Sequence, residues 1–427
     1  MTMNRRKIKV DFFWASCSHF VSKLVGFLVI IILTRYLDKS KMGEFFFAAS
    51  LSSFFAIFTE LGTNQYLIRE VSEKPNDAIR HLSDIVSIRL PIQGVVFLLL
   101  SAFTIIFKSS IFKTVCLTSI YIFLEELYFS FGAFFLGLKK VYHRAVTLIS
   151  AKLLLASLIL LVIKKNASLT TILICYNFAN FFLVGIAFYL VWKKYGPFRL
   201  NIKWDEGRRI IKNSLPFFIL SVLALVHFKF DTIMLGFMRP YSAVATYEAG
   251  FKLLEVSQFV IRPVRMVFFP IIVGLAANQN WEQIKSLFKK TLWITGSFGV
   301  IITAVVLTSA ELIVTLVFGV NYDKTAVVIE ILFLSAPILY MGFVSIFFAS
   351  ALHIEKMAGW IMLVGVVSNI ILNAIGIPWL GVIGAAWASV ISQTIITVWL
   401  IRLTVKTLQT NRDKNNFTAL PILGNNE

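Results

Sequence analysis

The sequence is poor in charged residues, and this scarcity excludes a soluble fold. Only 15% of its 427 residues are Asp, Glu, Lys or Arg, whereas 58% are hydrophobic and the mean hydropathy is +0.81. A soluble globular domain carries about a quarter charged residues. Apolar segments of about 20 residues recur instead, each long enough to cross the hydrocarbon core of a membrane as a helix. The alternating pattern of β-barrel strands is absent from these continuous apolar runs.

Cysteine and catalytic motifs are also scarce. The three cysteines, Cys17, Cys116 and Cys175, fall inside apolar segments without the spacing of a disulfide framework or a zinc site, which predicts buried free thiols. No Gly-rich phosphate-binding loop of the P-loop kind is present, so nucleotide hydrolysis by this chain is not expected. The five histidines show no nucleophile and base arrangement, and no large loop could carry the chemistry of a glycan polymerase or ligase. The sequence therefore predicts neither an enzyme, nor a bound metal, nor a cofactor.

We expect an all-α integral membrane protein with twelve transmembrane helices. The predicted spans are residues 11–33, 43–67, 84–107, 114–137, 145–163, 168–192, 213–236, 243–275, 288–308, 325–350, 357–377 and 380–401. An even number of spans places both termini on one side of the membrane. By our count, 25 Lys and Arg residues lie on the side of the termini and nine on the other, and cytoplasmic loops carry the positive excess. Both termini are therefore predicted to be cytoplasmic. The net charge of +19 is explained by basic residues that set the orientation in the membrane and contact anionic lipids, and not by binding to nucleic acid.

The layout of the first half of the chain recurs in the second half. Adding 202 moves Leu33 onto Leu235 and Leu51 onto Leu253, while adding 214 moves Leu138 onto Leu352 after an extra polar insertion, FGVNYDK. Six helices per half enter from the same face, so we expect two pseudo-symmetric six-helix bundles around a central cavity, related by an axis along the membrane normal. The expected domains are an N-terminal half at 1–193, a basic cytoplasmic linker at 194–212, a C-terminal half at 213–408 and a disordered tail at 409–427.

Several stretches together resemble a known family. They read LTRYLDKSKMGEFFFAASL (33–51), ELGTNQYLIREV (60–71), FDTIMLG (230–236), FGVNY (318–322) and GVIGAAWASVISQ (381–393). The chain is similar to polysaccharide repeat-unit flippases of the Wzx type, in the multidrug/oligosaccharidyl-lipid/polysaccharide exporter superfamily. The resemblance implies two six-helix bundles facing each other across a central cavity. It also implies a polyprenyl-pyrophosphate-linked oligosaccharide as substrate, in a bacterial inner membrane.

Ionisable residues inside the predicted spans are candidate functional residues, because a charge in the membrane is costly. In the eighth span Glu248, Lys252, Glu255, Arg262 and Arg265 follow a spacing that places them along one helical face. Such a stripe either lines a water-filled cavity or forms an ion-pair ladder between helices, and Pro263 and Pro270 predict a bend there.

Other spans carry further candidates. Lys23 shares a face with His19 in the first span, and His227 shares a face with Asp231 in the seventh, with Lys229 pointing roughly the opposite way. Glu60 and Lys152 lie in the second and fifth spans. Glu125 and Glu126 point about 100° apart, so at most one lies fully in the cavity. Arg89, near the start of the third span, is expected to extend its side chain to the cytoplasmic surface.

The charges fit a substrate with an anionic head and a hydroxyl-rich body. The predicted substrate-binding cations are Lys23, Lys152, Lys229, Lys252, Arg262 and Arg265, and the predicted coupling or ion-pair acids are Glu60, Asp231, Glu248 and Glu255. Charge alone admits other anions equally well, so the lipid-linked glycan comes from the resemblance. Membrane lipids, glycan polymerase and chain-length proteins, and a coupling H+ or Na+ are the expected partners. Two alternatives stay open: an ion-coupled small-molecule or multidrug exporter on the same fold, and a non-transporting scaffold for glycan-assembly enzymes.

Overall fold

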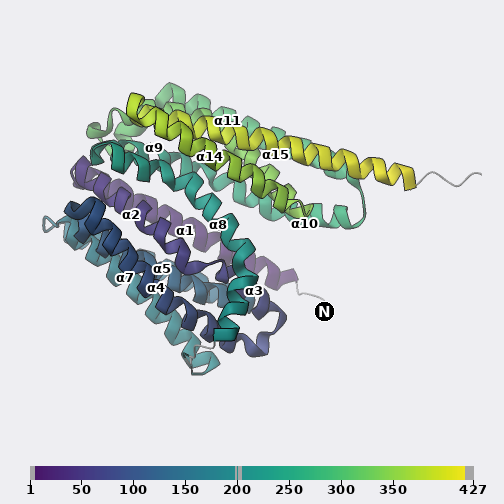
Figure 1. Cartoon of the computed structure of the whole chain (residues 1–427), viewed down its shortest axis with the longest axis horizontal. Helices are drawn as coiled ribbons and strands as arrows, with labels where there is room; N and C mark the ends of the chain where they lie inside the picture. Colours follow the sequence, from purple (N-terminus) through teal and green to yellow (C-terminus); the bar gives the residue numbers. More distant parts are fainter. Residues whose placement is uncertain (1–4, 198–199, 201–203, 419–427) are drawn as a thin grey trace, which may run out of the picture. The chain divides into compact units, whose positions relative to one another are not determined.

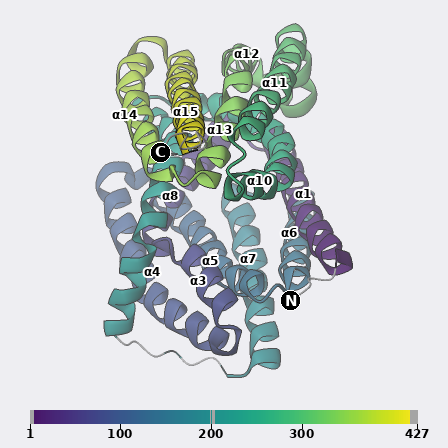
Figure 2. The same cartoon turned by 90° about the vertical axis from the view of Figure 1, so that its right-hand side faces the viewer.

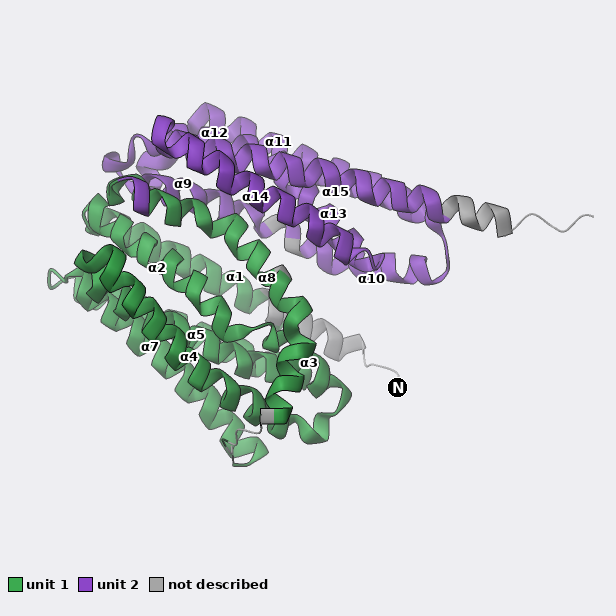
Figure 3. Ribbon diagram, in the orientation of Figure 1, with its two compact units in different colours: residues 1–236, 240–245 green, residues 237–239, 246–427 purple. Residues whose placement is uncertain are grey.

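The computed structural model describes residues 5–197, 200 and 204–418, and every regular element in these residues is a helix (Figure 1). The chain divides into two compact units, shown in different colours in Figure 3. Unit 1 comprises residues 1–236 and 240–245, and unit 2 comprises residues 237–239 and 246–427. The predicted all-α class is therefore confirmed. The predicted halves at 1–193 and 213–408 stay a prediction, because the compact units report packing and not symmetry.

Unit 1 is built around α5. Its helices are α1 (Arg5–Tyr36), α2 (Lys39–Glu60), α3 (Thr63–Glu73), α4 (Ala78–Lys108), α5 (Phe112–Gly137), α6 (Val141–Ile163), α7 (Leu169–Tyr195) and most of α8 (Trp204–Met238). Helix α5 packs against α2, α3, α4, α6 and α7, and Figure 2 shows α5, α6 and α7 side by side. Tyr128 and Phe134 of α5 are fully buried in a core that also includes Leu67 of α3 and Leu82 of α4. Helix α5 is thus the central helix against which the polar side chains of its neighbours converge.

Unit 2 repeats this arrangement around α13. It contains most of α9 (Tyr241–Ser257), then α10 (Ile261–Ala277), α11 (Trp281–Phe318), α12 (Thr325–Leu334), α13 (Ala336–Ala351), α14 (Glu355–Leu380) and α15 (Val382–Thr418). Helix α13 contacts α10, α11, α12, α14 and α15. Phe347 and Phe348 of α13 pack with Phe288 of α11 in an apolar core.

The helix boundaries confirm the two repeat offsets expected from the sequence. Helix α2 begins at Lys39 and α9 at Tyr241, which reproduces the offset of 202. Helix α6 begins at Val141 and α14 at Glu355, which reproduces the offset of 214. The turns before α6 and α14 even share a left-handed residue, Lys139 with φ 56° and His353 with φ 57°. The internal repeat is therefore a property of local structure as well as of sequence.

Among the described residues, nine helical segments are long and apolar enough to cross a membrane, or ten if the pair α12 and α13, bent by 44°, counts as one span. The chain is a multi-pass membrane protein. The higher count of ten is still two below the predicted twelve, for two reasons. The segment Pro75–Gly137 is counted once although it contains both α4 and α5, and α9 and α10 are each too short to be counted.

Besides the span at 325–350, which is the bent pair α12 and α13, two further predicted spans are broken helices rather than continuous ones. The span at 43–67 is interrupted between α2 and α3, and the span at 243–275 is interrupted by a 3₁₀ turn, η3 (Gln258–Val260). The stripe predicted along one face of the eighth span is therefore wrong as a single helical face. The break precedes Pro263, the third residue of α10, where a missing backbone N–H is tolerated because the first turn has no partner for it.

The predicted linker and tail are partly helical. Helix α8 begins at Trp204, inside the predicted linker, and α15 continues through Thr418, inside the predicted tail. Residues 198–199, 201–203 and 419–427 of these two segments lie outside the described residues. The three cysteines are free, as predicted, although only Cys175 is buried and Cys17 and Cys116 are partly exposed.

Candidate functional site

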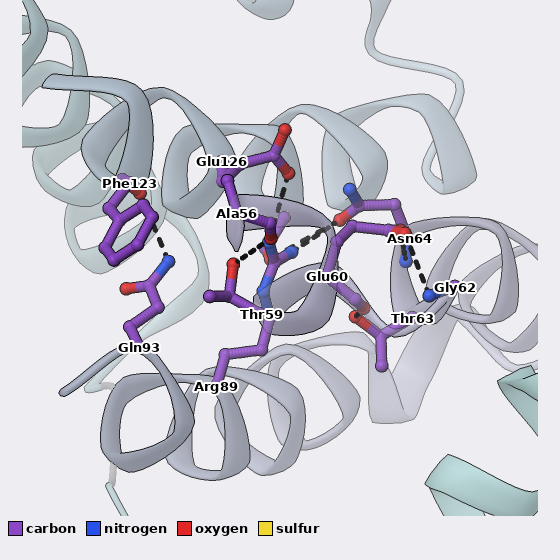
Figure 4. Close-up of polar contacts among 11 residues, drawn as sticks. Ala56, Thr59, Glu60, Gly62, Thr63, Asn64, Arg89, Gln93, Phe123 and Glu126 are labelled. Carbon is purple, nitrogen blue, oxygen red and sulfur yellow. Dashed lines mark hydrogen bonds and ion pairs between the residues drawn. The ribbon is translucent and has the colours of Figure 1, made fainter. Parts of the chain in front are cut away.

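The break between α2 and α3 organises a polar cluster inside unit 1. Leu61 and Gly62 both adopt left-handed conformations, with φ of 49° and 74°, which ends α2 and redirects the chain into α3. The carboxylate of Glu60 accepts hydrogen bonds from the backbone N–H groups of Gly62 at 2.8 Å and Asn64 at 3.0 Å (Figure 4). Glu60 thus satisfies two N–H groups that the start of a helix leaves without helical partners.

Arg89 of α4 lies beside this break and is fully buried. Its Nη1 donates to Asn64 Oδ1 at 2.9 Å and to Ser130 Oγ at 2.7 Å, and its Nη2 donates to Glu126 Oε2 of α5 at 3.3 Å. Figure 4 shows the guanidinium reaching from α4 toward Glu126 on one side and Asn64 on the other. We call Glu60, Asn64, Arg89, Glu126 and Ser130 the Arg89 cluster. It joins α3, α4 and α5 through a single cation.

The expectation that Arg89 extends to the membrane surface is wrong. Arg89 lies eleven residues after the start of α4, about three helical turns from that end. A carboxylate, an amide and a hydroxyl on two neighbouring helices lie within hydrogen-bonding distance of its guanidinium. These contacts replace the hydrogen bonds to water that the guanidinium loses on burial. Without them the arginine side chain would have to reach the membrane surface to be hydrated.

Glu125, next to Glu126, faces a different helix. Its Oε1 accepts from Lys152 Nζ of α6 at 3.3 Å, and both side chains are only partly buried. The adjacent acids therefore pair with two different cations, as their expected separation of about 100° around α5 allows. Lys152, a predicted substrate-binding residue, is therefore part of an ion pair in which both side chains stay partly exposed.

The Arg89 cluster has no counterpart at the matching positions of the second repeat. Helices α4 and α11 begin at Ala78 and Trp281, an offset of 203 that pairs Arg89 with Leu292. Helices α5 and α13 end at Gly137 and Ala351, an offset of 214 that pairs Glu126 with Tyr340.

These counterparts make different contacts. Leu292 packs against the apolar core of unit 2, and the Tyr340 hydroxyl donates to Ser257 Oγ at 2.7 Å. The corresponding helices of unit 2 are thus built without an ion pair at these two positions, so the repeated fold does not by itself require the pair of Arg89 with Glu126.

The remaining predicted residues lie on separate helices. In unit 2, Lys252 and Glu255 of α9 pair at 2.7 Å and Glu248 is 1% exposed. Arg265 of α10 lies 6.0 Å from the ring centre of Phe269, and the side chain of Arg262 is outside the described residues.

Three further predicted residues belong to unit 1. Lys23 of α1 is exposed, Lys229 of α8 is partly buried and Asp231 of α8 is 2% exposed. The different burial of Lys229 and Asp231 agrees with their expected opposite faces. That the six cations meet in one cavity stays a prediction.

Sequence reasoning missed the roles of Asn64, Arg89 and Ser130. The available signal was an arginine in one apolar span and a glutamate pair in the next, which together permit an interhelical ion pair. Ser130 carried no such signal, because hydroxyl side chains are common in transmembrane helices. There they usually donate a hydrogen bond to a backbone carbonyl of the preceding helical turn.

Comparison with known proteins identifies the family. The profile of the polysaccharide biosynthesis protein family matches residues 8–276. The chain belongs to this family. It is 24% identical over 184 residues to a protein of Haloferax volcanii whose name describes it as a probable flippase, a match that covers 42% of this chain and only 38% of that relative. The chain thus spans well under two thirds of that relative's length.

Solved structures share the fold over nearly the whole chain. A lipid II flippase, MurJ, in an inward closed conformation has a TM-score of 0.72 at 16% identity and covers 96% of this chain and 93% of its own. An inward-facing multidrug resistance transporter of the MATE family has a TM-score of 0.72 at 11% identity, covering 92% and 96%. At these identities the likeness concerns the fold, which is that of the MATE and MurJ transporters.

Proposed function

We propose that this chain is a flippase that moves a polyprenyl-pyrophosphate-linked oligosaccharide repeat unit across the cytoplasmic membrane by alternating access, for surface polysaccharide biosynthesis. The observation that carries this proposal is membership of the polysaccharide biosynthesis family over residues 8–276, on a fold shared with a lipid II flippase. The task of such a protein is movement of a headgroup and not bond making, so the proposed function is not enzymatic.

The ion pairs of Lys152 and Lys252 suit the binding of pyrophosphate. Each ammonium carries three donors, and both pairs stay 22–30% exposed. A phosphate oxygen could therefore approach either ammonium from its exposed side without leaving a buried acid uncompensated. We assign Lys23, Lys229, Arg262 and Arg265 to the same proposed set. Arg89 differs, because its two terminal nitrogens are already occupied in a fully buried site.

Counting broken helices leads from the observed segments to the proposed twelve spans. A single helix of 63 residues, the length of Pro75–Gly137, would be about 95 Å long, about three times the hydrocarbon thickness. Helices α4 and α5 also pack against each other, which supports two crossings. Taking α12 with α13 and α9 with α10 as two bent spans gives twelve, and we propose that these form two six-helix bundles around a central cavity.

The proposed location is the bacterial cytoplasmic membrane with both termini inside. It is supported by the excess of Lys and Arg on the side of the termini. Polymerase and chain-length proteins are proposed partners because they would receive the exported repeat unit, and H+ or Na+ is the proposed coupling ion.

Deletion of the gene separates this proposal from its alternatives. A flippase deletion should leave lipid-linked repeat units in the cytoplasmic leaflet, protected from a glycan-modifying enzyme added outside intact spheroplasts. The MATE-like fold makes a drug exporter the second candidate, which would instead show drug sensitivity with normal glycan export. Normal handling of both would support a scaffold and overturn the flippase.

A further inference from the structure

A polar pocket opens at one end of unit 1, where the α1–α2 and α6–α7 connections meet the start of α5. Its volume is about 480 Å³, within the range of roughly 300–1,000 Å³ found for small-molecule sites. The side chains that matter for recognition are those of Tyr36, Asp38, Lys41, Glu44, Thr114 and Asn166. All six belong to unit 1, and none belongs to the Arg89 cluster.

The walls of this pocket are fastened by hydrogen bonds. The Tyr36 hydroxyl donates to the carbonyl of Ala167 at 3.0 Å, which ties the end of α1 to the α6–α7 connection. Glu44 is 7% exposed and accepts from Thr114 Oγ1 and, at 2.8 Å, from Lys41 Nζ. The pocket is therefore held in shape by side chains from α1, α2 and α5, so that a ligand meets prearranged groups.

Other polar groups of the pocket remain open to a ligand. Asp38 occupies the N-cap position of α2 but its side chain makes no capping hydrogen bond, and the residue is exposed. Asn166, left-handed with φ 52°, is also exposed. A carboxylate accepts from two neighbouring hydroxyls, an amide both donates and accepts, and a tyrosine ring offers an apolar face.

The charge of the pocket selects among polar ligands. Asp38 and Glu44 supply two negative charges and Lys41 one positive charge, and the positive charge is already paired with Glu44. The side chains that line the pocket therefore carry a net negative charge, which disfavours a phosphate group, although Lys39, Lys113 and Lys165 flank them in the sequence. A neutral ligand with several hydroxyl groups matches both the acceptors and the donors.

The fold does not require this polarity. With the offset of 202, Asp38, Lys41 and Glu44 correspond to Pro240, Ala243 and Thr246 in the second repeat. The offset of 214 pairs Asn166 with Leu380. In the second repeat these four positions are thus uncharged, while Arg239 takes the place of Leu37 and its guanidinium donates to the carbonyl oxygens of Ile377 and Pro378. The acidic lining of the first repeat therefore calls for an explanation beyond folding.

We propose that this pocket binds a neutral sugar residue through Asp38 and Asn166, with Tyr36 beneath the ring. The identification of that sugar with part of the transported glycan rests on the proposed function. Under the proposed orientation the pocket opens on the outer side of the membrane, where it would hold a glycan that has crossed.

The test is binding of small glycosides to the purified full-length chain in nanodiscs, measured by saturation-transfer NMR. The probes are methyl glucoside, methyl galactoside and N-acetylglucosamine, with inorganic pyrophosphate as competitor. Asp38→Ala removes an exposed carboxylate that caps nothing, so the variant should fold. Asp323→Ala is the matched control, an exposed acid in a connection of unit 2.

We expect saturable binding of at least one glycoside, weakened at least about tenfold by Asp38→Ala, which is the loss of roughly one hydrogen bond to a charged group. Asp323→Ala should bind as the unsubstituted chain does. Absence of saturable binding to all three glycosides, equal loss in both variants, or displacement by pyrophosphate would each overturn the sugar pocket. Glycoside binding in a chain whose deletion leaves glycan export normal would keep the pocket and overturn the proposed function instead.

Discussion

The fully buried Arg89 of α4 and the partly exposed Glu126 of α5 form an ion pair at 3.3 Å between two apolar helices. The repeat places Leu292 and Tyr340 at the corresponding positions of unit 2. The pair is thus an asymmetric feature of a repeated fold. Its position beside the break between α2 and α3 links the conformation of that break to the charge on two neighbouring helices.

Removing one partner of this pair should destabilise the protein strongly. Glu126→Gln leaves the fully buried Arg89 guanidinium without its carboxylate, which costs about 3–5 kcal/mol. Arg89→Gln leaves Glu126 without its cation and should cost less, because that side chain is partly exposed. The double variant removes both charges and should recover most of that stability. Thermal unfolding of the purified variants in detergent measures this. If the double variant is destabilised by as much as the two single variants added together, the two charges do not interact.

The Arg89 cluster also predicts a difference between arginine and lysine. Arg89→Lys keeps the positive charge beside Glu126 but has no planar fork with which to reach Asn64, Ser130 and Glu126 together. We expect Arg89→Lys to be more stable than Arg89→Gln and less stable than the unsubstituted chain. If the two variants unfold at the same temperature, the charge contributes nothing and only the shape of the arginine matters.

Gly62 should not tolerate alanine. Its φ of 74° is left-handed, and a Cβ there would lie 2.4 Å from the carbonyl oxygen of Ser214. Backbone strain of this kind costs about 1–3 kcal/mol before the clash is counted. Gly94→Ala is the matched control, because Gly94 is helical and a Cβ there meets nothing within 4 Å. Size-exclusion chromatography of the extracted proteins should show loss of the folded peak for Gly62→Ala alone.

The twelve-span topology predicts which connections can be labelled from outside the cell. After replacement of Cys17, Cys116 and Cys175, single cysteines at Lys39, Ser109 and Asn321 should react with an impermeant maleimide added to intact cells. Cysteines at Lys74, Lys194 and Glu355 should react only after the membrane is opened. External labelling at any of the latter three would contradict the proposed arrangement of spans.

The helices and their repetition could be predicted from the sequence, because apolar length and the spacing of motifs are local properties. The offset of 202 anticipated the starts of α2 and α9 at Lys39 and Tyr241. The breaks could not be predicted equally well. Leu61 is left-handed although leucine rarely adopts that conformation, and the Gly62 position is fixed by Ser214, far along the chain.

The candidate site was predicted only in part for the same reason. Glu60, Lys152 and the separation of Glu125 from Glu126 followed from span positions and helical geometry. The burial of Arg89 depends on Asn64, Glu126 and Ser130, which come from α3 and α5 and converge only through packing. When such partners are unknown, an arginine near the end of a predicted span is expected to extend its side chain to the membrane surface.

The proposed substrate-binding cations predict a selective loss of export. Lys252→Gln and Arg262→Gln should each lower export per inserted molecule by about tenfold, since a charge-assisted hydrogen bond is worth about 1.5–3 kcal/mol. Arg262→Lys should lose less, because it keeps the charge. Lys356→Gln, an exposed lysine at the start of α14, should export normally. Normal export by both glutamine variants would contradict a cationic binding site.

The central claim is tested most directly by reconstitution. The purified chain is inserted into liposomes that carry the lipid-linked repeat unit isolated from a host lacking this gene, and the fraction of glycan accessible to an external glycosidase is followed over time. We predict that the accessible fraction rises beyond the outer-leaflet share in liposomes with the protein, and that Lys252→Gln slows the rise at equal protein content. The same measurement is made with the unsubstituted chain under imposed H+ and Na+ gradients. If the accessible fraction stays at the outer-leaflet share under both gradients, the chain is not a flippase.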